Sequence, residues 1–370
     1  MRKILIITIT LSLVTTIFVG CVPDENKDVP VKLRWRYKTS FYGYSAPVVV
    51  GDVVYIGDQL DCIYAIDKDT GELIWQFCED NAIFTSPSVA DGMVYVGEPS
   101  RNPYANDYLC AIDAASGELK WRFKTGDSAS SCGSPFVFDG IVYIRTSNKI
   151  LYAVDADSGE LEWSFETEKP ITTKLSVTGG VVYVGSLDEN LYAIDAKSGE
   201  LKWRYMVDYY INSSASVSEG VVFIGTLVGI DSSEDDYLYA IDTNSGELKW
   251  KYKMKCTRAL SPTLVDGLVY VGSWDHYLYT IDVDSGELKQ RFKTGGPVYS
   301  SASVVADIIY VGSDDYYLYA IDSNNSVLKW RYRTKGKVTS SVVVDDVIYF
   351  GSFGAKDSYL YALELKKNNQ

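Results

Sequence analysis

Short segments of alternating apolar and polar residues, separated by tight-turn sequences, follow one another along almost the whole chain. In one stretch, TSPSVA (residues 85–90) leads through Asp-Gly into MVYVG (93–97), and LCAID (109–113) leads through Ser-Gly into ELKWRFKT (118–125). A hydrophobic period of two predicts β-strands, and Asp-Gly pairs and glycine-bearing turns predict antiparallel hairpins. The stretch therefore predicts four antiparallel strands.

The four-strand pattern repeats along the chain. AIDKDTGELIW (65–75) returns as AIDAASGELKW (111–121), AVDADSGELEW (153–163), AIDAKSGELKW (193–203) and AIDTNSGELKW (240–250), and then as two degenerate copies, TIDVDSGELKQ (280–290) and AIDSNNSVLKW (320–330). With Trp35 at the front, the last residues of these strings are spaced by 40, 46, 42, 40, 47, 40 and 40 positions. Four antiparallel strands in such a period are typical of one β-propeller blade.

The two ends of the repeat array complement each other. The first segment (33–39) has the charged and aromatic character of an outer strand, and the last one, YLYALEL (359–365), lacks an outer strand after it. Pairing of these ends closes the ring and removes the exposed edges. We therefore predict an all-β fold: an eight-bladed β-propeller over residues 33–365, with its Ser-, Ala- and Val-rich strands near the axis, followed by a polar tail (366–370).

Residues 1–20 have the order of a secretory signal peptide: two basic residues, an apolar run of 16 residues, and then Gly20 before Cys21. That run is short for a membrane-spanning helix. The residues before Cys21 resemble the lipobox of bacterial and archaeal lipoproteins, although Phe18 stands where Leu is usual. The resemblance implies a lipidated Cys21 and a polar tether over 21–32, in a membrane-anchored protein at the cell surface or in the periplasm. Plain secretion and a retained membrane anchor are the alternatives.

Composition excludes several kinds of chemistry. The only histidine is His276, so one copy of the chain cannot build a site that needs two imidazoles. The 35 Lys and Arg against 49 Asp and Glu give a net charge of −14, which repels a phosphate backbone, so no nucleic-acid partner is expected. No feature of the sequence indicates self-association, and we expect a monomer.

The cysteines include one candidate disulfide pair. Apart from Cys21 there are five, at positions 62, 78, 110, 132 and 256, and none has CxxC spacing, so no metal site is expected from them. Cys62 and Cys78 flank the turn around Thr70 symmetrically and would lie opposite each other in a hairpin. They predict a cross-strand disulfide in an oxidising compartment; two free, half-buried thiols are the alternative.

The string Ala-x-Asp-x-x-Ser/Thr-Gly-x-x-x-Trp resembles the tryptophan-docking motif of the pyrroloquinoline-quinone-type (PQQ-like) eight-bladed propellers. The resemblance covers roughly residues 33–365 and is closest in layout to BamB-type lipoproteins. In that family the tryptophan packs between neighbouring blades. The resemblance therefore implies that the junctions between blades are packed by Trp35, Trp75, Trp121, Trp163, Trp203, Trp250 and Trp330, which have structural docking roles. At the remaining junction Gln290 stands in the tryptophan position, and weaker packing is expected there.

The turn sequences DKDTGE (67–72), DADSGE (155–160) and DVDSGE (282–287) look like calcium loops. Copies without the second Asp, such as DAASGE, favour a different interpretation, in which the first carboxylate accepts N–H bonds of its own turn. We expect no metal site there.

Departures from the repeat indicate where a partner binds. The additional residues lie between the second and third strands, at 98–107, 226–236 and 352–358, and before a first strand, at 126–132. All these connections emerge on one face of a propeller, and a face that accepts insertions is the usual place for binding. The candidate residues on it are Arg101, Tyr104, Arg145, Lys174, Arg258, Trp274, His276 and Tyr299. The cations suit an acidic partner; scattered solvated charges are the alternative.

Two functions remain. The first is a non-catalytic scaffold without cofactor, lipid-anchored, that binds a protein or glycan partner through this face. The alternative, implied by the resemblance, is a PQQ-dependent quinoprotein dehydrogenase with the quinone and calcium in the axial cavity. Such enzymes carry adjacent cysteines over the cofactor and are usually much longer, and this chain has no adjacent cysteines. We therefore predict no catalytic residue.

Overall fold

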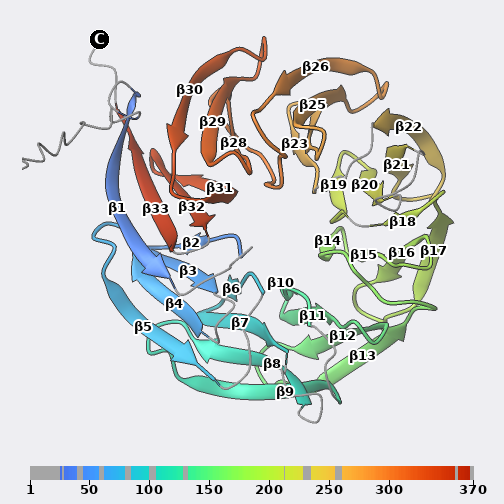
Figure 1. The fold of residues 1–370 in the computed structure, drawn as a ribbon. Coiled ribbons are helices and arrows are strands. Elements are labelled where there is room, and N and C mark those ends of the chain that lie inside the picture. The colour runs from blue at the N-terminus through green and yellow to red at the C-terminus, as the bar shows by residue number, and fades with distance from the viewer. Residues whose placement is uncertain are drawn as a thin grey trace, which may run out of the picture.

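The computed structural model describes residues 26, 29–39, 45–57, 62–79, 85–99, 106–127, 132–211, 213–227, 235–254, 261–354 and 357–366. These residues form 33 strands in eight sheets, and none of them is helical. Accordingly, no helix in the described ranges is long and apolar enough to cross a membrane. Figure 1 shows the sheets as blades around a central axis, with the first strand of each blade facing the axis. The predicted eight-bladed β-propeller is confirmed.

Blades 1 to 4 are consecutive sheets, each with its strands paired in chain order. Blade 1 holds β2 (Val48–Val50), β3 (Val53–Gly57), β4 (Cys62–Asp67) and β5 (Leu73–Cys78). Blade 2 holds β6 (Ser88–Ala90), β7 (Met93–Glu98), β8 (Asn106–Asp113) and β9 (Leu119–Asp127). Blade 3 holds β10 (Phe136–Phe138), β11 (Ile141–Arg145), β12 (Ile150–Asp155) and β13 (Leu161–Glu166). Blade 4 holds β14 (Ser176–Thr178), β15 (Val181–Gly185), β16 (Asn190–Asp195) and β17 (Leu201–Met206).

Blades 5 to 8 complete the ring. Blade 5 holds β19 (Ser216–Ser218), β20 (Val221–Leu227), β21 (Asp236–Asp242) and β22 (Leu248–Met254), and the short β18 (Tyr210–Ile211) also pairs with the end of β20. Blade 6 holds β23 (Thr263–Val265), β24 (Leu268–Gly272), β25 (Tyr277–Asp282) and β26 (Leu288–Lys293). Blade 7 holds β27 (Ser303–Val305), β28 (Ile308–Gly312), β29 (Tyr317–Asp322) and β30 (Leu328–Arg333). Blade 8 holds β31 (Lys337–Val344), β32 (Val347–Phe353), β33 (Ser358–Leu365) and β1 (Val31–Thr39).

Hydrophobic burial is organised by the junctions between blades. The middle strands are buried on both faces because a blade packs on each side: in β15, Val182 and Val184 are fully buried on one face, and Tyr183 is buried on the other. The outer strand β17 instead alternates exposed charges with half-buried Trp203 and Tyr205. Within the described residues there are eight hydrophobic clusters, one for each junction. The ring is therefore held together by eight similar interfaces.

The tryptophans lie at these junctions. In six of them, the indole Nε1 donates a hydrogen bond to a backbone carbonyl of the next blade. This carbonyl belongs to the residue that follows the first Asp of the turn between the third and fourth strands. The pairs are Trp35 with Lys68 (2.9 Å), Trp75 with Ala114 (2.9 Å), Trp121 with Ala156 (3.1 Å), Trp163 with Ala196 (3.0 Å), Trp203 with Thr243 (2.8 Å) and Trp250 with Val283 (2.8 Å). Trp330 packs at the junction of blades 7 and 8 without such a bond to any described residue.

The glycine of each turn lies flat against the tryptophan of the preceding blade. A Cβ atom on Gly199 would come within 2.7 Å of the Trp163 ring, and the backbone there is left-handed (φ 73°), so only glycine fits. The one turn that carries serine, Ser326, faces the one junction without tryptophan, where Gln290 Nε2 donates to Asn324 O over 2.6 Å. Loss of the indole and loss of the glycine therefore occur together.

The chain ends close the ring as predicted. β1 pairs antiparallel with β33, from Val31 opposite Leu365 to Thr39 opposite Ser358. The strand begins at Val31, two residues before the predicted start. Part of the predicted tether also contacts the propeller, because Asn26 exchanges two hydrogen bonds with the backbone of Arg333 (2.7 and 3.0 Å). A side-chain amide can pair with a strand edge in this way. The sequence did not indicate this contact.

The predicted disulfide is present in blade 1. Cys62 and Cys78 are directly opposite in the β4–β5 ladder, with their Cα atoms 4.2 Å apart, and their sulfurs are bonded. Cys110 and Cys132 are free and buried, and Cys256 lies outside the described residues.

Candidate functional site

The propeller has two faces that differ in the connections they carry. The looped face holds the connections between second and third strands and those between blades; the turn face holds the two tight turns of each blade. All the predicted insertions lie on the looped face, where strands β7, β8, β20 and β21 extend beyond their counterparts. Arg101 and Tyr104, in the insertion at 98–107, lie outside the described residues, and so do Arg258 and Cys21.

An aromatic and charged cluster occupies the looped face over blades 6 to 8. The rings of Trp274 and Tyr299 meet edge to face, with centroids 5.0 Å apart. Lys337 Nζ lies 5.7 Å from the centre of the Tyr299 ring and 2.5 Å from Asp314 Oδ2. Burial raises the pKa of Asp314, and the ammonium of Lys337 partly opposes that shift. The four side chains form one half-buried patch that joins three blades, which we call the aromatic patch.

His276 contributes to this region through its backbone. It adopts a left-handed conformation (φ 72°) in the turn between β24 and β25, and its carbonyl accepts hydrogen bonds from Thr294 N (2.8 Å) and Thr294 Oγ1 (2.9 Å). These bonds tie the turn that carries Trp274 to the connection that carries Tyr299. His276 therefore supports the position of the aromatic patch.

Asp314 was not among the candidates from the sequence, although the repeat contains a signal for it. The second-to-third-strand turn has Ser-Trp-Asp at 273–275 and Ser-Asp-Asp at 313–315. The Asp at the third position of each turn accepts hydrogen bonds from a nearby backbone N–H and from a tyrosine hydroxyl: Asp275 pairs with Tyr279 and Asp315 with Tyr319. The position occupied by Trp274 and Asp314 is thus the variable one, and alignment of the repeats would have shown both.

Two predicted cations lie closer to the axis, in a separate place. Arg145, at the end of β11, donates from Nη1 to Ile171 O over 2.9 Å, and its buried Nε has no hydrogen-bond partner. Burial lowers the pKa of Arg145 to about 10. Lys174 lies in the connection between blades 3 and 4, where its side chain reaches solvent from a recess of the protein. The protein around this recess, and then the guanidinium of Arg145, lower the pKa of Lys174. Neither cation has an ion-pair partner among the described carboxylates.

Lys174 also lines a cavity of about 310 Å³ on the inner strands of blades 1 to 4, the axial pocket. Its other walls are apolar side chains, prolines and hydroxyls such as those of Ser86 and Ser134. No carboxylate lies among these lining residues, and no group of three His, Cys, Asp or Glu in the described ranges could hold a metal ion. The described lining therefore does not fit a calcium-bound quinone, which needs oxygen ligands for the metal.

The free thiols are unsuited to redox chemistry. Cys110 contacts the buried Glu98 (Sγ to Oε2, 2.9 Å), and burial and that carboxylate hold the Cys110 pKa well above its usual range. Burial likewise raises the pKa of Cys132 to about 12. Because the thiolate is the reactive form, both residues act as packing side chains.

The model of the family described as outer membrane protein assembly factor BamB matches residues 32–135, 103–177 and 153–369. The chain belongs to this family. The matched residues cover the whole ring of blades, from β1 to β33. The membership leaves open which activity this particular propeller has, since fold alone does not decide function.

Individual relatives fall into two groups. BamB of Yersinia pestis is 31% identical over 140 residues, which are 34% of this chain and 33% of that protein. The putative dehydrogenase XoxF of Paracoccus denitrificans is 29% identical over 119 residues, 28% of this chain and 18% of that protein. The matched segments thus span a third or less of these relatives.

Several solved structures have a fold similar to that of this chain. The crystal structure of BamB from Moraxella catarrhalis superposes with a TM-score of 0.73, covering 92% of this chain and 99% of that one at 17% identity. A quinohemoprotein alcohol dehydrogenase of Pseudomonas putida also gives 0.73, covering 94% of this chain and 78% of that one at 15% identity. At these identities the comparison establishes the fold alone.

Proposed function

We propose that the protein is a non-catalytic scaffold of the cell envelope that holds a protein partner on its looped face. The observation that carries the proposal is the aromatic patch, in which Trp274, Tyr299 and Lys337 come together from three blades around a T-shaped aromatic pair. Tryptophan and tyrosine in partly buried clusters dominate the binding energy of protein interfaces. The family is described as outer membrane protein assembly factor BamB, and the relative from Yersinia pestis carries that name, which supports an envelope scaffold.

The same proposal places the chain outside the cytoplasm. The predicted signal peptide and lipidated Cys21 would tether it to a membrane, and the tether reaches the propeller at Asn26, five residues later. An extended chain spans roughly 3.3 to 3.6 Å per residue, so the rim at blade 7 would lie within about 18 Å of the lipid surface. A partner on the looped face would then be bound close to the membrane.

The unpartnered Arg145 Nε and the nearby Lys174 favour an acidic segment in that partner. A buried donor without an acceptor is costly, and a carboxylate brought by the partner would satisfy it. A glycan would meet the aromatic patch but would leave these two cations without a counter-charge. We therefore favour a protein with an acidic loop.

A quinoprotein dehydrogenase is the second candidate, because dehydrogenases occur among the relatives. Its test is direct: PQQ and calcium are added to the purified protein, and the quinone absorbance and the melting temperature are recorded. We expect neither to change. A shifted quinone spectrum together with a raised melting temperature would favour the enzyme.

The scaffold is tested by co-purification from solubilised envelopes, with bound proteins measured by mass spectrometry. We expect Trp274→Ala to reduce the recovered partner at least tenfold. Val327→Ala, which truncates an exposed side chain on the turn face, serves as the matched control and should leave recovery unchanged. Equal recovery with all three proteins would contradict the proposed binding face.

A further inference from the structure

The junction between blades 7 and 8 differs from the others because blade 8 is built from both ends of the chain. In blades 1 to 7 a turn joins the third strand to the fourth, and in blade 1, for example, Gly71 N donates to Asp67 O over 2.9 Å. In blade 8 the strands run on instead: Val31 pairs with Leu365, and Lys366 N donates to Pro30 O over 2.9 Å. The turn that covers the docking tryptophan elsewhere is therefore missing here.

Without this turn, a pair of hydrogen-bond donors has no acceptor among the described residues. In blade 3, Trp163 Nε1 (3.0 Å) and Tyr143 Oη (2.9 Å) donate to one carbonyl, that of Ala196 in the next blade. The same double donation is made by Trp35 and Tyr349, by Trp75 and Tyr55, and by Trp121 and Tyr95. In blade 7 the corresponding Trp330 Nε1 and Tyr310 Oη bond to none of the described residues.

The donor pair of blade 7 is nonetheless preformed. The ring centroids of Tyr310 and Trp330 are 5.9 Å apart at 50°, against 5.8 Å and 50° for Tyr143 and Trp163. The two rings therefore have the geometry that clamps a carbonyl at the other junctions. Only the acceptor is missing from the part of the chain that the structure describes.

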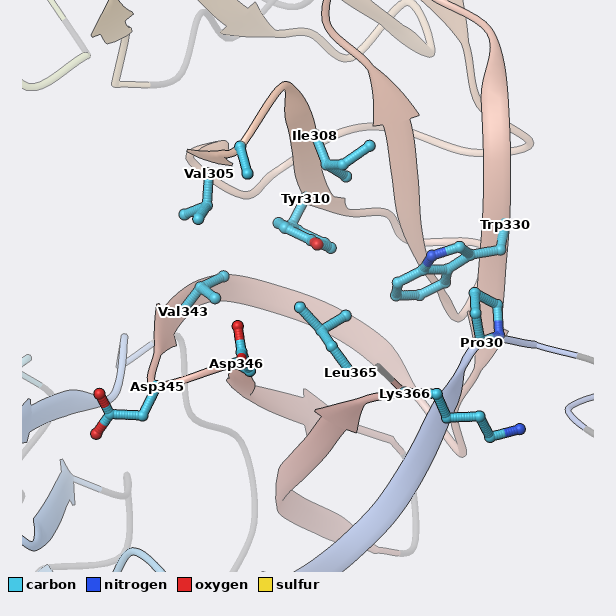
Figure 2. A pocket seen from close by; sticks show the side chains of 11 residues that line it. Pro30, Val305, Ile308, Tyr310, Trp330, Val343, Asp345, Asp346, Leu365 and Lys366 are labelled. Carbon is cyan, nitrogen blue, oxygen red and sulfur yellow. The ribbon is translucent and has the colours of Figure 1, made fainter. Parts of the chain in front are cut away.

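A cavity of about 480 Å³ opens at this place, and we call it the seam groove. Figure 2 shows Tyr310, Trp330 and Leu365 around it, with Asp346 beside Leu365 and with Asp345 and Lys366 toward opposite ends. The groove is thus mainly apolar inside, with charges of both signs at its rim. It lies on the turn face, away from the aromatic patch.

We propose that the seam groove binds a glycine-containing turn of another polypeptide, whose backbone carbonyl accepts hydrogen bonds from Trp330 and Tyr310. The fold itself supplies the template, because six junctions hold such a turn against the tryptophan. Glycine is required, since a Cβ atom on the covering residue would come within 2.6 to 2.8 Å of the indole in each of them.

The chain's own C-terminal residues are poor occupants of the groove. Residues 367–370, Lys-Asn-Asn-Gln, contain neither a glycine nor an apolar side chain. We assign the groove to a second partner, which the protein could hold while the looped face is occupied.

The test follows the indole N–H signals by NMR, with the Trp330 signal assigned from its absence in Trp330→Phe. The probe is a disulfide-cyclised peptide that carries residues 193–202, the protein's own turn from blade 4. We expect the Trp330 signal to move downfield and its hydrogen exchange to slow, while the Trp203 signal stays in place. Loss of one hydrogen bond in Trp330→Phe or in Tyr310→Phe should weaken peptide binding about three- to tenfold.

Two controls separate binding in the groove from unspecific contact. Trp250→Phe, at an occupied junction, should leave peptide affinity unchanged, and a peptide with Gly199→Val should not bind. The proposal is overturned if millimolar peptide leaves the Trp330 signal unmoved in folded protein, or if the valine peptide binds equally well. It is also overturned if deletion of residues 367–370 speeds Trp330 exchange, which would show an intramolecular occupant, or if exchange slows with protein concentration, which would show a second copy.

Discussion

At the residue scale, the two residues that face each other across a blade junction depend on one another. An indole in one blade requires a glycine in the next, because the turn backbone lies against the ring. The junction of Gln290 with Ser326 shows the converse: without the indole, a left-handed serine (φ 54°) is accepted. This junction also leaves Gln290 Oε1 buried without a hydrogen bond, so it is the weak one among those with a turn.

Replacing a docking tryptophan should destabilise the ring. Trp203→Ala removes a large part of the junction of blades 4 and 5 together with the bond to Thr243 O. We expect a loss of about 3 to 5 kcal/mol in the free energy of unfolding, measured by denaturant titration. A midpoint equal to that of the wild type would refute the docking role.

The coupling between the indole and the glycine can be measured in a double-mutant cycle. Gln290→Trp alone should gain nothing, because the Cβ atom of Ser326 occupies the place of the ring. Gln290→Trp with Ser326→Gly should be more stable than the wild type by about 1 to 3 kcal/mol. Additive effects of the two substitutions would show that the pairing is accidental.

At the element scale, the turn between the third and fourth strands is held by its first residue. In blade 4, Asp195 Oδ1 accepts bonds from Lys197 N (3.1 Å), Ser198 N (3.0 Å) and Ser198 Oγ (3.2 Å). The predicted carboxylate-capped turn is the arrangement found. The carboxylate of the second Asp of DKDTGE takes no part in it: Asp69 donates its backbone N–H to Asp67 Oδ1 (3.0 Å), and its carboxylate pairs with Arg34. The carboxylate spacing that looks like a calcium loop is therefore explained by hydrogen bonds within the turn and by this ion pair.

These turns make stability depend on acid pH. Hydrogen bonds from the turn N–H groups, and then the partner side chains, lower the pKa of Asp113, Asp195 and Asp282 to about 2, from an ordinary value of 3.8. A carboxyl with a depressed folded pKa stabilises the fold above its unfolded pKa, and this contribution is lost as the pH falls through the folded value. We expect the melting temperature to fall between pH 4 and pH 2, and Asp195→Asn to flatten part of that fall. A flat profile over this window would show that the turns are not coupled to folding.

At the scale of the whole molecule, sequence reasoning succeeded wherever the repeat was regular. The blade count, the strand order and the closing pair of β1 and β33 follow from periodic positions and from two incomplete ends. The Asn26 contact, the pairing of Asp314 with Lys337, and the open groove beside Trp330 could not be predicted, because each arises between segments that the repeat does not relate. Both proposed binding sites lie at irregular places of this kind.

The central claim is that a partner binds the looped face at the aromatic patch. A photo-reactive amino acid at Tyr299, with the same residue at Asn325 on the turn face as control, tests it most directly in intact envelopes. The account predicts one dominant cross-linked protein from position 299 that is absent from position 325 and is lost with Trp274→Ala. Equal cross-linking from both positions, or none from position 299 in the folded protein, would contradict it.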